Sequence, residues 1–140
     1  MKHKMICGVA LAALGACWGA PPNERILTQL CQDVFAGDAA IARDIDERAG
    51  TDLDGFCVCY GATIAVDTAK RDVHKDVSLA IANARAGTDR DTEDGAETVE
   101  DMIRAGEIDS FTEEQLMQVG DDYQDVMYDM SRNNGVCPTP

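Results

Sequence analysis

The sequence predicts an all-α protein: a single small bundle of four to six helices held together by two disulfides. Three observations support this expectation. Apolar residues recur every three or four positions through most of the chain, which is the period of an amphipathic helix. Of the 140 residues, the 124 that follow a short leader suffice for one compact domain but not for two. Four of the six cysteines remain once the leader and its cleavage-site cysteine are set aside.

The N-terminus has the features of an export signal. Lys2 and Lys4 precede an uncharged, mostly apolar run over residues 5–16, which is too short to cross a bilayer as a helix. The motif Leu14-Gly15-Ala16-Cys17 at its end resembles the lipobox of bacterial lipoprotein precursors. That resemblance implies that Cys17 becomes the new N-terminus and is modified with lipid, palmitate among the fatty acids.

This interpretation divides the chain into a signal peptide over residues 1–16, a lipid-anchored spacer over 17–22 and a helical domain over 23–140. It implies a cell-envelope location, facing the periplasm or the cell surface. Ordinary signal cleavage is the alternative, and it would leave a soluble periplasmic or secreted protein. Such cleavage favours small residues one and three positions before the cut. A cut after Ala20 places Trp18 at the third position, so the sequence favours the lipoprotein route.

The predicted mature chain is strongly acidic. All 26 acidic residues follow the cut, against 10 remaining basic residues, which gives a net charge of −16. Such a field repels nucleic acid and anionic lipid head groups, and it favours basic proteins or cations. Nucleic-acid binding is therefore excluded, and a protein partner is expected. An acidic surface that only keeps the protein soluble is the plainer alternative.

Two helices are predicted in the first third of the domain. Asn23 is placed to cap the first, whose single apolar stripe runs to Phe35. Asp38 is placed to cap the second, which runs to Ala49. A glycine follows each helix closely and is expected to end it.

The centre of the chain predicts a helix from Phe56 to about Arg71, followed by a helical segment over residues 73–86. The second segment is expected to continue the first, because no strong helix breaker separates them. A β-branched run over residues 63–66 leaves a strand there as the alternative.

The last part of the chain predicts a loop, a short helix and a long helix. Residues 87–97 contain no large apolar side chain and predict a loop, and the short helix follows over 98–105. Thr112-Glu113-Glu114-Gln115 has the form of a capping box that starts the last helix, and Asn133-Asn134-Gly135 is expected to end it. Three methionines are assigned to the core face of that helix: Met117, Met127 and Met130.

Cys57 and Cys59 are the most specific feature of the mature chain. Two positions on a helix differ by about 200° around its axis, so the two thiols face opposite ways. We therefore expect them to bond different partners, Cys31 in the first helix and Cys137 in the tail. The pairing of Cys31 with Cys57 and Cys59 with Cys137 is only slightly preferred, because the sequence does not show which helix meets which face.

A redox-active Cys57-Cys59 pair is the enzymatic alternative. It requires a thiolate pKa lowered by a helix N-terminus or nearby cations, and the acidic surroundings work against that. Zinc is not expected, since His74 is the only histidine of the mature chain, and we assign it to a solvated polar face. No cofactor is expected, and a single histidine supports no serine–histidine–acid set, so the chain is not expected to be an enzyme.

One acidic segment imitates five ligand positions of a calcium-binding loop: Asp89, Asp91, Glu93, Glu97 and Glu100. The match fails at two positions that shape such a loop. The sixth position is Asp94 instead of glycine, and the eighth is Ala96 instead of a large aliphatic residue. We expect weak calcium attraction at most, and no true metal site.

Leu30-Cys31 in the first helix and Cys59-Tyr60-Gly61 in the central helix resemble small periplasmic immunity proteins. Those proteins are helical, disulfide-bonded inhibitors of cell-wall amidase toxins. Cys57 and the acidic loop depart from their pattern. The expected function is a non-catalytic envelope lipoprotein, either an accessory protein or a protein-binding one. An inhibitor of a toxin or enzyme is the alternative, and a thiol redox protein is the second alternative.

The lipobox makes a direct prediction about anchoring. Cys17→Ser removes the thiol that accepts the lipid, so fatty-acid labelling of the protein should disappear. The variant should then be recovered uncleaved or in the soluble fraction. Radiolabelled fatty acid incorporation and membrane fractionation measure this, and equal labelling of both proteins would rule the lipobox out.

Overall fold

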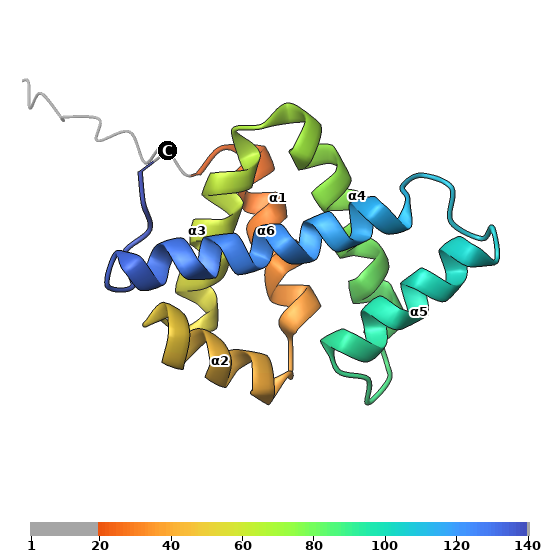
Figure 1. The fold of residues 1–140 in the computed structure, drawn as a ribbon, viewed down its shortest axis with the longest axis horizontal. Helices are drawn as coiled ribbons and strands as arrows, with labels where there is room; N and C mark the ends of the chain where they lie inside the picture. Colours follow the sequence, from red (N-terminus) through yellow and green to blue (C-terminus); the bar gives the residue numbers. More distant parts are fainter. Residues whose placement is uncertain (1–19, 140) are drawn as a thin grey trace, which may run out of the picture.

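The structure, a computed structural model, describes residues 20–139 and confirms the all-α fold (Figure 1). Within this range there is no strand, so the alternative of a strand over residues 63–66 is wrong. None of the helices described is both long enough and apolar enough to cross a bilayer. The six helices are α1 (Pro22–Phe35), α2 (Ala39–Ala49), α3 (Leu53–Ala65), α4 (Thr68–Arg85), α5 (Thr92–Arg104) and α6 (Glu113–Arg132).

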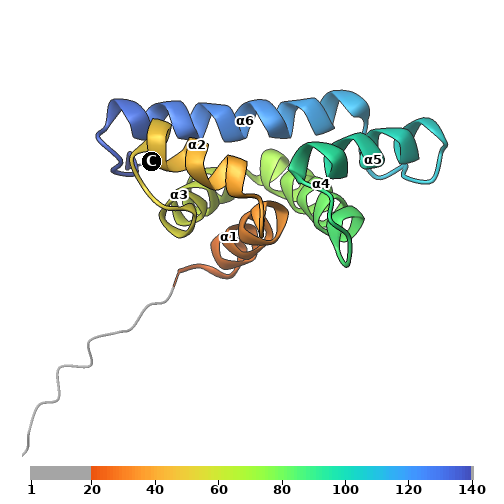
Figure 2. The same ribbon diagram turned by 90° about the horizontal axis from the view of Figure 1, so that it is seen from below.

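The helices are stacked with α6 on one outer side of the molecule. In Figure 2, α6 runs along one side of the molecule and α1 lies on the other, with α3 and α4 between them. Helix α1 packs against both α3 and α4, while α2 and α5 pack against α6 at different places along its length. The core lies where α6 crosses α1, α3 and α4, and its largest fully buried side chains include Tyr60 and Phe56.

Two disulfides hold α3 to its neighbours. Cys31–Cys57 joins α1 to α3, and Cys59–Cys137 joins α3 to the tail that follows α6. All four cysteines within residues 20–139 are thus bonded, and Cys57 and Cys59 have different partners. This is the pairing that the sequence slightly preferred.

Gly61 allows α1 and α3 to approach closely. A β-carbon added at this buried glycine would lie 2.8 Å from the carbonyl oxygen of Glu24 and 3.0 Å from the backbone nitrogen of Thr28. Because these are backbone atoms, they cannot move aside as a flexible side chain would. Only glycine therefore fits at this point of the helix contact.

Several predicted helix ends are confirmed. Asp38 caps α2 by accepting a hydrogen bond from the Ile41 backbone N–H, and Gly50 ends that helix with a φ of 70°. Thr112 and Gln115 form the capping box of α6. After that helix, Asn134 and Gly135 adopt positive φ values of 53° and 79°, a common way to end a helix.

The prediction that the central helix continues past residue 67 is wrong. Helix α3 already begins at Leu53 and ends at Ala65. Asp67 has an extended backbone, and its side chain accepts hydrogen bonds from the backbone N–H groups of Ala69 and Lys70. This cap starts α4 as a separate helix, since the capping residue itself cannot be helical.

The prediction of a loop over residues 87–97 is confirmed for 87–91 and wrong for 92–97. Helix α5 begins at Thr92, because Asp91 caps it by accepting a hydrogen bond from the Asp94 backbone N–H at 2.9 Å. The acidic side chains of Glu93 and Asp94 lie in its first turn, where the helix dipole favours negative charge. The low apolar content of this turn had concealed the helix.

Two side chains also differ from expectation. Asn23 does not cap α1, which begins at Pro22; its side chain instead accepts a hydrogen bond from Lys75 Nζ at 2.7 Å. Met117 is 65 % exposed, whereas Met127 and Met130 are buried as expected. Position 117 lies outside the buried stripe of α6, on its solvent side.

The two disulfides should contribute to stability independently. They close loops with sequence separations of 26 and 78 residues that do not overlap. Loop-closure entropy then gives at most about 3.6 and 4.5 kcal/mol. Cys31→Ala with Cys57→Ala, and Cys59→Ala with Cys137→Ala, should lower the free energy of unfolding by amounts of this order, additively when combined. Urea unfolding measures the losses. Strong non-additivity, or a Cys57–Cys59 peptide in non-reduced maps, would contradict the pairing.

Candidate functional site

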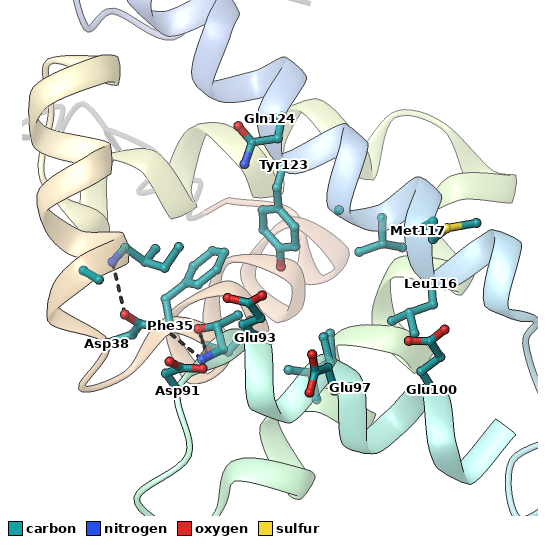
Figure 3. Close-up of a pocket in the computed structure, with 18 of the residues that line it drawn as sticks. Phe35, Asp38, Asp91, Glu93, Glu97, Glu100, Leu116, Met117, Tyr123 and Gln124 are labelled. Atoms are coloured by element: carbon teal, nitrogen blue, oxygen red, sulfur yellow. Dashed lines mark hydrogen bonds between the residues drawn. The ribbon is translucent and has the colours of Figure 1, made fainter. Parts of the chain in front are cut away.

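A cavity of about 600 Å³ opens between α2, α5 and α6 (Figure 3). All six helices contribute to its lining, so it exists only in the assembled fold. Its volume is within the range of about 300–1,000 Å³ that ligand-binding cavities show. It combines an apolar floor with an acidic rim.

The floor follows one face of α6. Leu116, Val119, Tyr123 and Met127 form a stripe at helical spacing that lines the cavity. Eleven residue steps separate the first from the last, which corresponds to about 16 Å along the helix. Near the centre, the ring of Tyr123 meets the ring of Phe35 edge-on, with centroids 5.0 Å apart. The floor is thus long and partly aromatic.

Two residues of α6 keep the floor accessible. Met117 is 65 % exposed and lines the cavity at its edge. Gly120 lies among the residues of the stripe, and a β-carbon added there would meet no atom within 4 Å. A flexible thioether and a bare stretch of backbone together form an adaptable contact surface.

Asp38 fixes two walls of the cavity to each other. Its carboxylate accepts hydrogen bonds from the Ile41 backbone N–H at 3.1 Å and from the Thr92 backbone N–H at 3.0 Å. It therefore links the start of α2 to the start of α5. Burial alone would raise the pKa of Asp38. The N–H hydrogen bonds and the nearby Arg85 lower that pKa by a larger amount, so the net shift is downward.

Three further rim carboxylates already have partners. Asp91 caps α5. Glu100 and Glu113 both pair with Arg104, whose Nε lies 3.0 Å from Glu113 Oε1. The contact between Arg104 and Glu113 holds the end of α5 to the start of α6.

Glu93 and Glu97 differ from the other rim carboxylates. Both are exposed, line the cavity, and form no ion pair or side-chain hydrogen bond with the residues that the structure describes. They are four positions apart on α5 and share one face of it, where Figure 3 shows both side chains at the cavity. Among the described residues that line the cavity, none is lysine or arginine. The rim is therefore negative on the α5 side.

The five calcium candidates do not form a calcium-binding loop. Asp89 and Asp91 precede α5, whereas Glu93, Glu97 and Glu100 lie within it. A helix cannot wrap around an ion as the calcium loop does. No group of acidic, histidine or cysteine side chains within residues 20–139 is arranged to hold a metal ion. The structure instead places four of the five, all but Asp89, along one wall of the cavity.

A chain of buried polar groups lies beneath the floor. Tyr60 hydrogen-bonds His74 Nδ1, His74 Nε2 lies 2.7 Å from Asp122 Oδ2, and Lys70 Nζ lies 2.7 Å from Asp122 Oδ1. The Tyr60 ring stacks on that of Tyr123, with centroids 4.1 Å apart. His74 is 1 % exposed, so its assignment to a solvated face is wrong.

The protonation states of this chain follow from its environment. Burial lowers the pKa of His74 below 6.5, outweighing the hydrogen bond to Asp122, so the ring is neutral near pH 7. Burial alone would raise the pKa of Asp122. The hydrogen bonds from Lys70 and His74 lower that pKa by a larger amount, so the carboxylate stays charged. Burial raises the pKa of Tyr60 well above 10. Neutral His74 thus donates from Nε2 to Asp122 and accepts the Tyr60 hydroxyl at Nδ1.

The cysteines offer no reactive thiol within the described residues. Cys31, Cys57 and Cys59 are at most 1 % exposed, and each is in a disulfide. The redox hypothesis needs Cys57 and Cys59 as a dithiol, but here each is bonded elsewhere. Cys17, the predicted lipid attachment site, lies outside the described residues.

The acidic residues of this site stand out in the sequence, but the cavity does not. Only the second half of α5 is predicted as a helix, so its first half, with Glu93 and Glu97, is assigned to a loop instead of a helix face. A signal for the burial of His74 was present, since His74, Val77 and Ile81 lie at helical spacing and all three are buried. The floor itself required the crossing of α6 over the other helices, which no local pattern shows.

The neutral, buried state of His74 predicts a pH dependence of stability. An unfolded histidine titrates near 6.5 and the folded one below that, so the unfolded state gains a proton first as the pH falls. Stability should therefore decrease below about pH 6.5, by at most about 1.4 kcal/mol per pH unit. His74→Gln should abolish this component, because no other histidine remains in the predicted mature chain.

Urea unfolding of both proteins at pH 7.5 and pH 5.5 tests this prediction. Protonation of surface carboxylates affects both proteins alike and cancels in the difference between them. His74→Gln should also cost about 1–3 kcal/mol at pH 7.5, since it disturbs the partners of Tyr60 and Asp122. An equal loss of stability on acidification in the two proteins would contradict the neutral buried histidine.

Comparisons of the chain with models of protein families, with curated proteins and with solved structures find no match. The proposals that follow therefore rest on the residues and the geometry of this chain alone.

Proposed function

We propose that this chain is a non-catalytic envelope lipoprotein that binds a partner protein through the cavity between α2, α5 and α6. The supporting observation is the apolar floor, which remains open beside the exposed Met117 and the bare backbone of Gly120. A floor of this kind is typical of a surface that another molecule covers.

The arrangement of the titratable groups favours binding over catalysis. Tyr60, His74 and Asp122 satisfy one another beneath the floor and are at most 3 % exposed. Groups that act on a substrate need a free hydrogen-bonding position towards it. Here the hydrogen bonds of this set are used to hold α3, α4 and α6 together.

The lipobox supports the remainder of the proposal. Lipid on Cys17 would anchor the protein to a membrane of the cell envelope, and the spacer over residues 17–22 would separate the anchor from α1. The membrane is then a partner only through the lipid. The net charge of −16 that the predicted mature chain carries would keep the domain itself away from anionic head groups and leave it available to proteins.

Inhibition of a toxin or enzyme is the second candidate function. Two of the residues that resemble periplasmic immunity proteins lie at the contact between α1 and α3: Cys31 belongs to α1, and Gly61 packs against the backbone of α1. Cys31 there bonds Cys57, which departs from the pattern of those proteins, and Cys59 bonds Cys137. An inhibitor would abolish the activity of its bound partner, whereas an accessory protein would not.

Site-specific photocrosslinking tests the proposed function. A benzoylphenylalanine at Met117 lies at the cavity edge, and one at Tyr128, which is 58 % exposed on α6 outside the cavity, is the matched control. In intact envelopes, we expect one adduct from position 117 that excess purified domain competes away. The same adduct should be absent from position 128. Adducts from position 128 alone, or from neither position, would contradict binding through the cavity.

A further inference from the structure

We propose that the cavity receives a basic amphipathic helix of the partner protein, with its apolar face on α6 and its basic residues along α5. This inference rests on the proposed function, because it names the kind of segment that the cavity binds. Three features of the described residues support it: the length of the floor, the position of Gly120 and the charge of one wall.

The floor has the shape of a helix-binding groove. The apolar stripe from Leu116 to Met127 extends for about 16 Å, or about three helical turns. An amphipathic helix presents apolar side chains at i, i+3 or i+4, and i+7 over the same distance, and helices that bind in grooves are recognised through such anchors. The aromatic rings of Phe35 and Tyr123 lie at the floor and would contact these anchors.

Close packing among residues 20–139 does not account for Gly120, because a β-carbon added there would meet no atom within 4 Å. Glycine in the middle of a helix lowers helix stability relative to alanine, and such a residue is commonly retained where two backbones must approach closely. Gly61 has a close neighbour of this kind in α1, whereas the space beside Gly120 is open. The close approach at Gly120 is therefore expected to come from a bound helix.

The charge of the α5 wall selects a basic occupant. Glu93 and Glu97 are like charges four positions apart, an arrangement that destabilises a helix when no cation is present. Lysine or arginine residues four positions apart on one flank of the bound helix would pair with both. The opposite wall, formed by Ala40 and Ile41 of α2, is apolar, so basic residues are needed along one flank only.

Synthetic peptides provide the probe. One peptide combines a leucine stripe at helical spacing with lysines along one flank, a second replaces each lysine with glutamate, and a third scrambles the first. The protein is the mature chain with Cys17→Ser, and calorimetry measures binding. We expect the basic amphipathic peptide to bind at least about tenfold more tightly than either control. Its affinity should fall at about 1 M salt, where screening reaches about 3 Å.

Variants of the chain locate the binding. Glu93→Gln combined with Glu97→Gln should weaken the binding of the basic peptide several-fold. The control, Glu47→Gln combined with Glu107→Gln, removes the same amount of charge away from the cavity and should leave the affinity unchanged. Gly120→Leu should weaken binding about tenfold, because its side chain fills the space for the peptide backbone. Gly120→Ala should raise the urea midpoint of unfolding and still weaken binding, which separates the groove from any loss of fold.

The outcomes distinguish this inference from the proposed function. Equal binding of the basic and scrambled peptides, or binding unaffected by both the glutamate and the Gly120 variants, would overturn the basic helix. So would a simple alkylammonium ion that bound as tightly as the peptide. A specific adduct at position 117 would then still support protein binding at the cavity. Conversely, adducts from position 128 alone would overturn the proposed function whatever the peptides did.

Discussion

The opposite orientation of Cys57 and Cys59 on one helix is the constraint on which the rest of the structure depends. Because the two thiols lie on different sides of α3, one bond reaches α1 and the other reaches the tail behind α6. Helix α3 is thereby fixed on both sides in the middle of the molecule. Phe56 and Tyr60, which neighbour the two cysteines in the sequence, are consequently held in the core beneath α6.

This fixed helix also gives the cavity a rigid floor. Tyr60 stacks on Tyr123 and hydrogen-bonds His74, and His74 in turn contacts Asp122, so α3, α4 and α6 are linked by both packing and polar contacts. A charged carboxylate is costly to bury, and Asp122 is tolerated because Lys70 reaches it from the surface. A groove with a rigid floor loses little conformational freedom when it binds a partner.

Much of the fold could be predicted from local patterns, because these patterns report the same physics that the folded chain uses. The cap at Asp38, the capping box at Thr112 and the divergence of Cys57 and Cys59 each depend on a few neighbouring residues, and each is confirmed. The start of α5 was missed because its first turn is stabilised by a cap and a dipole and carries few apolar side chains. Its acidic residues then suggested a loop.

The site was harder to predict than the fold. The lining of the cavity combines Phe35 with Tyr123, and Ile41 with Met127. These residues are far apart in the sequence and come together only after the helices pack. The burial of His74 depends on the same crossing, since its sequence neighbours are mostly polar. Spacing showed that a face existed there, but not that another helix covered it. The cavity on which the proposed function rests exists only in the folded chain, and the motif Leu14-Gly15-Ala16-Cys17 bears on location alone.

The order of the disulfides has a consequence for how the protein matures. Read from the N-terminus, the first described cysteine bonds the second and the third bonds the fourth. If the protein is exported N-terminus first, as the proposed function requires, Cys31 can be oxidised with Cys57 and then Cys59 with Cys137 in the order in which they emerge, and no bond needs to be broken and remade. A bond between Cys57 and Cys59 would be the nearest error, and helix α3 places those two sulfurs on opposite sides. The order of emergence and the geometry of α3 would then favour the same pairing.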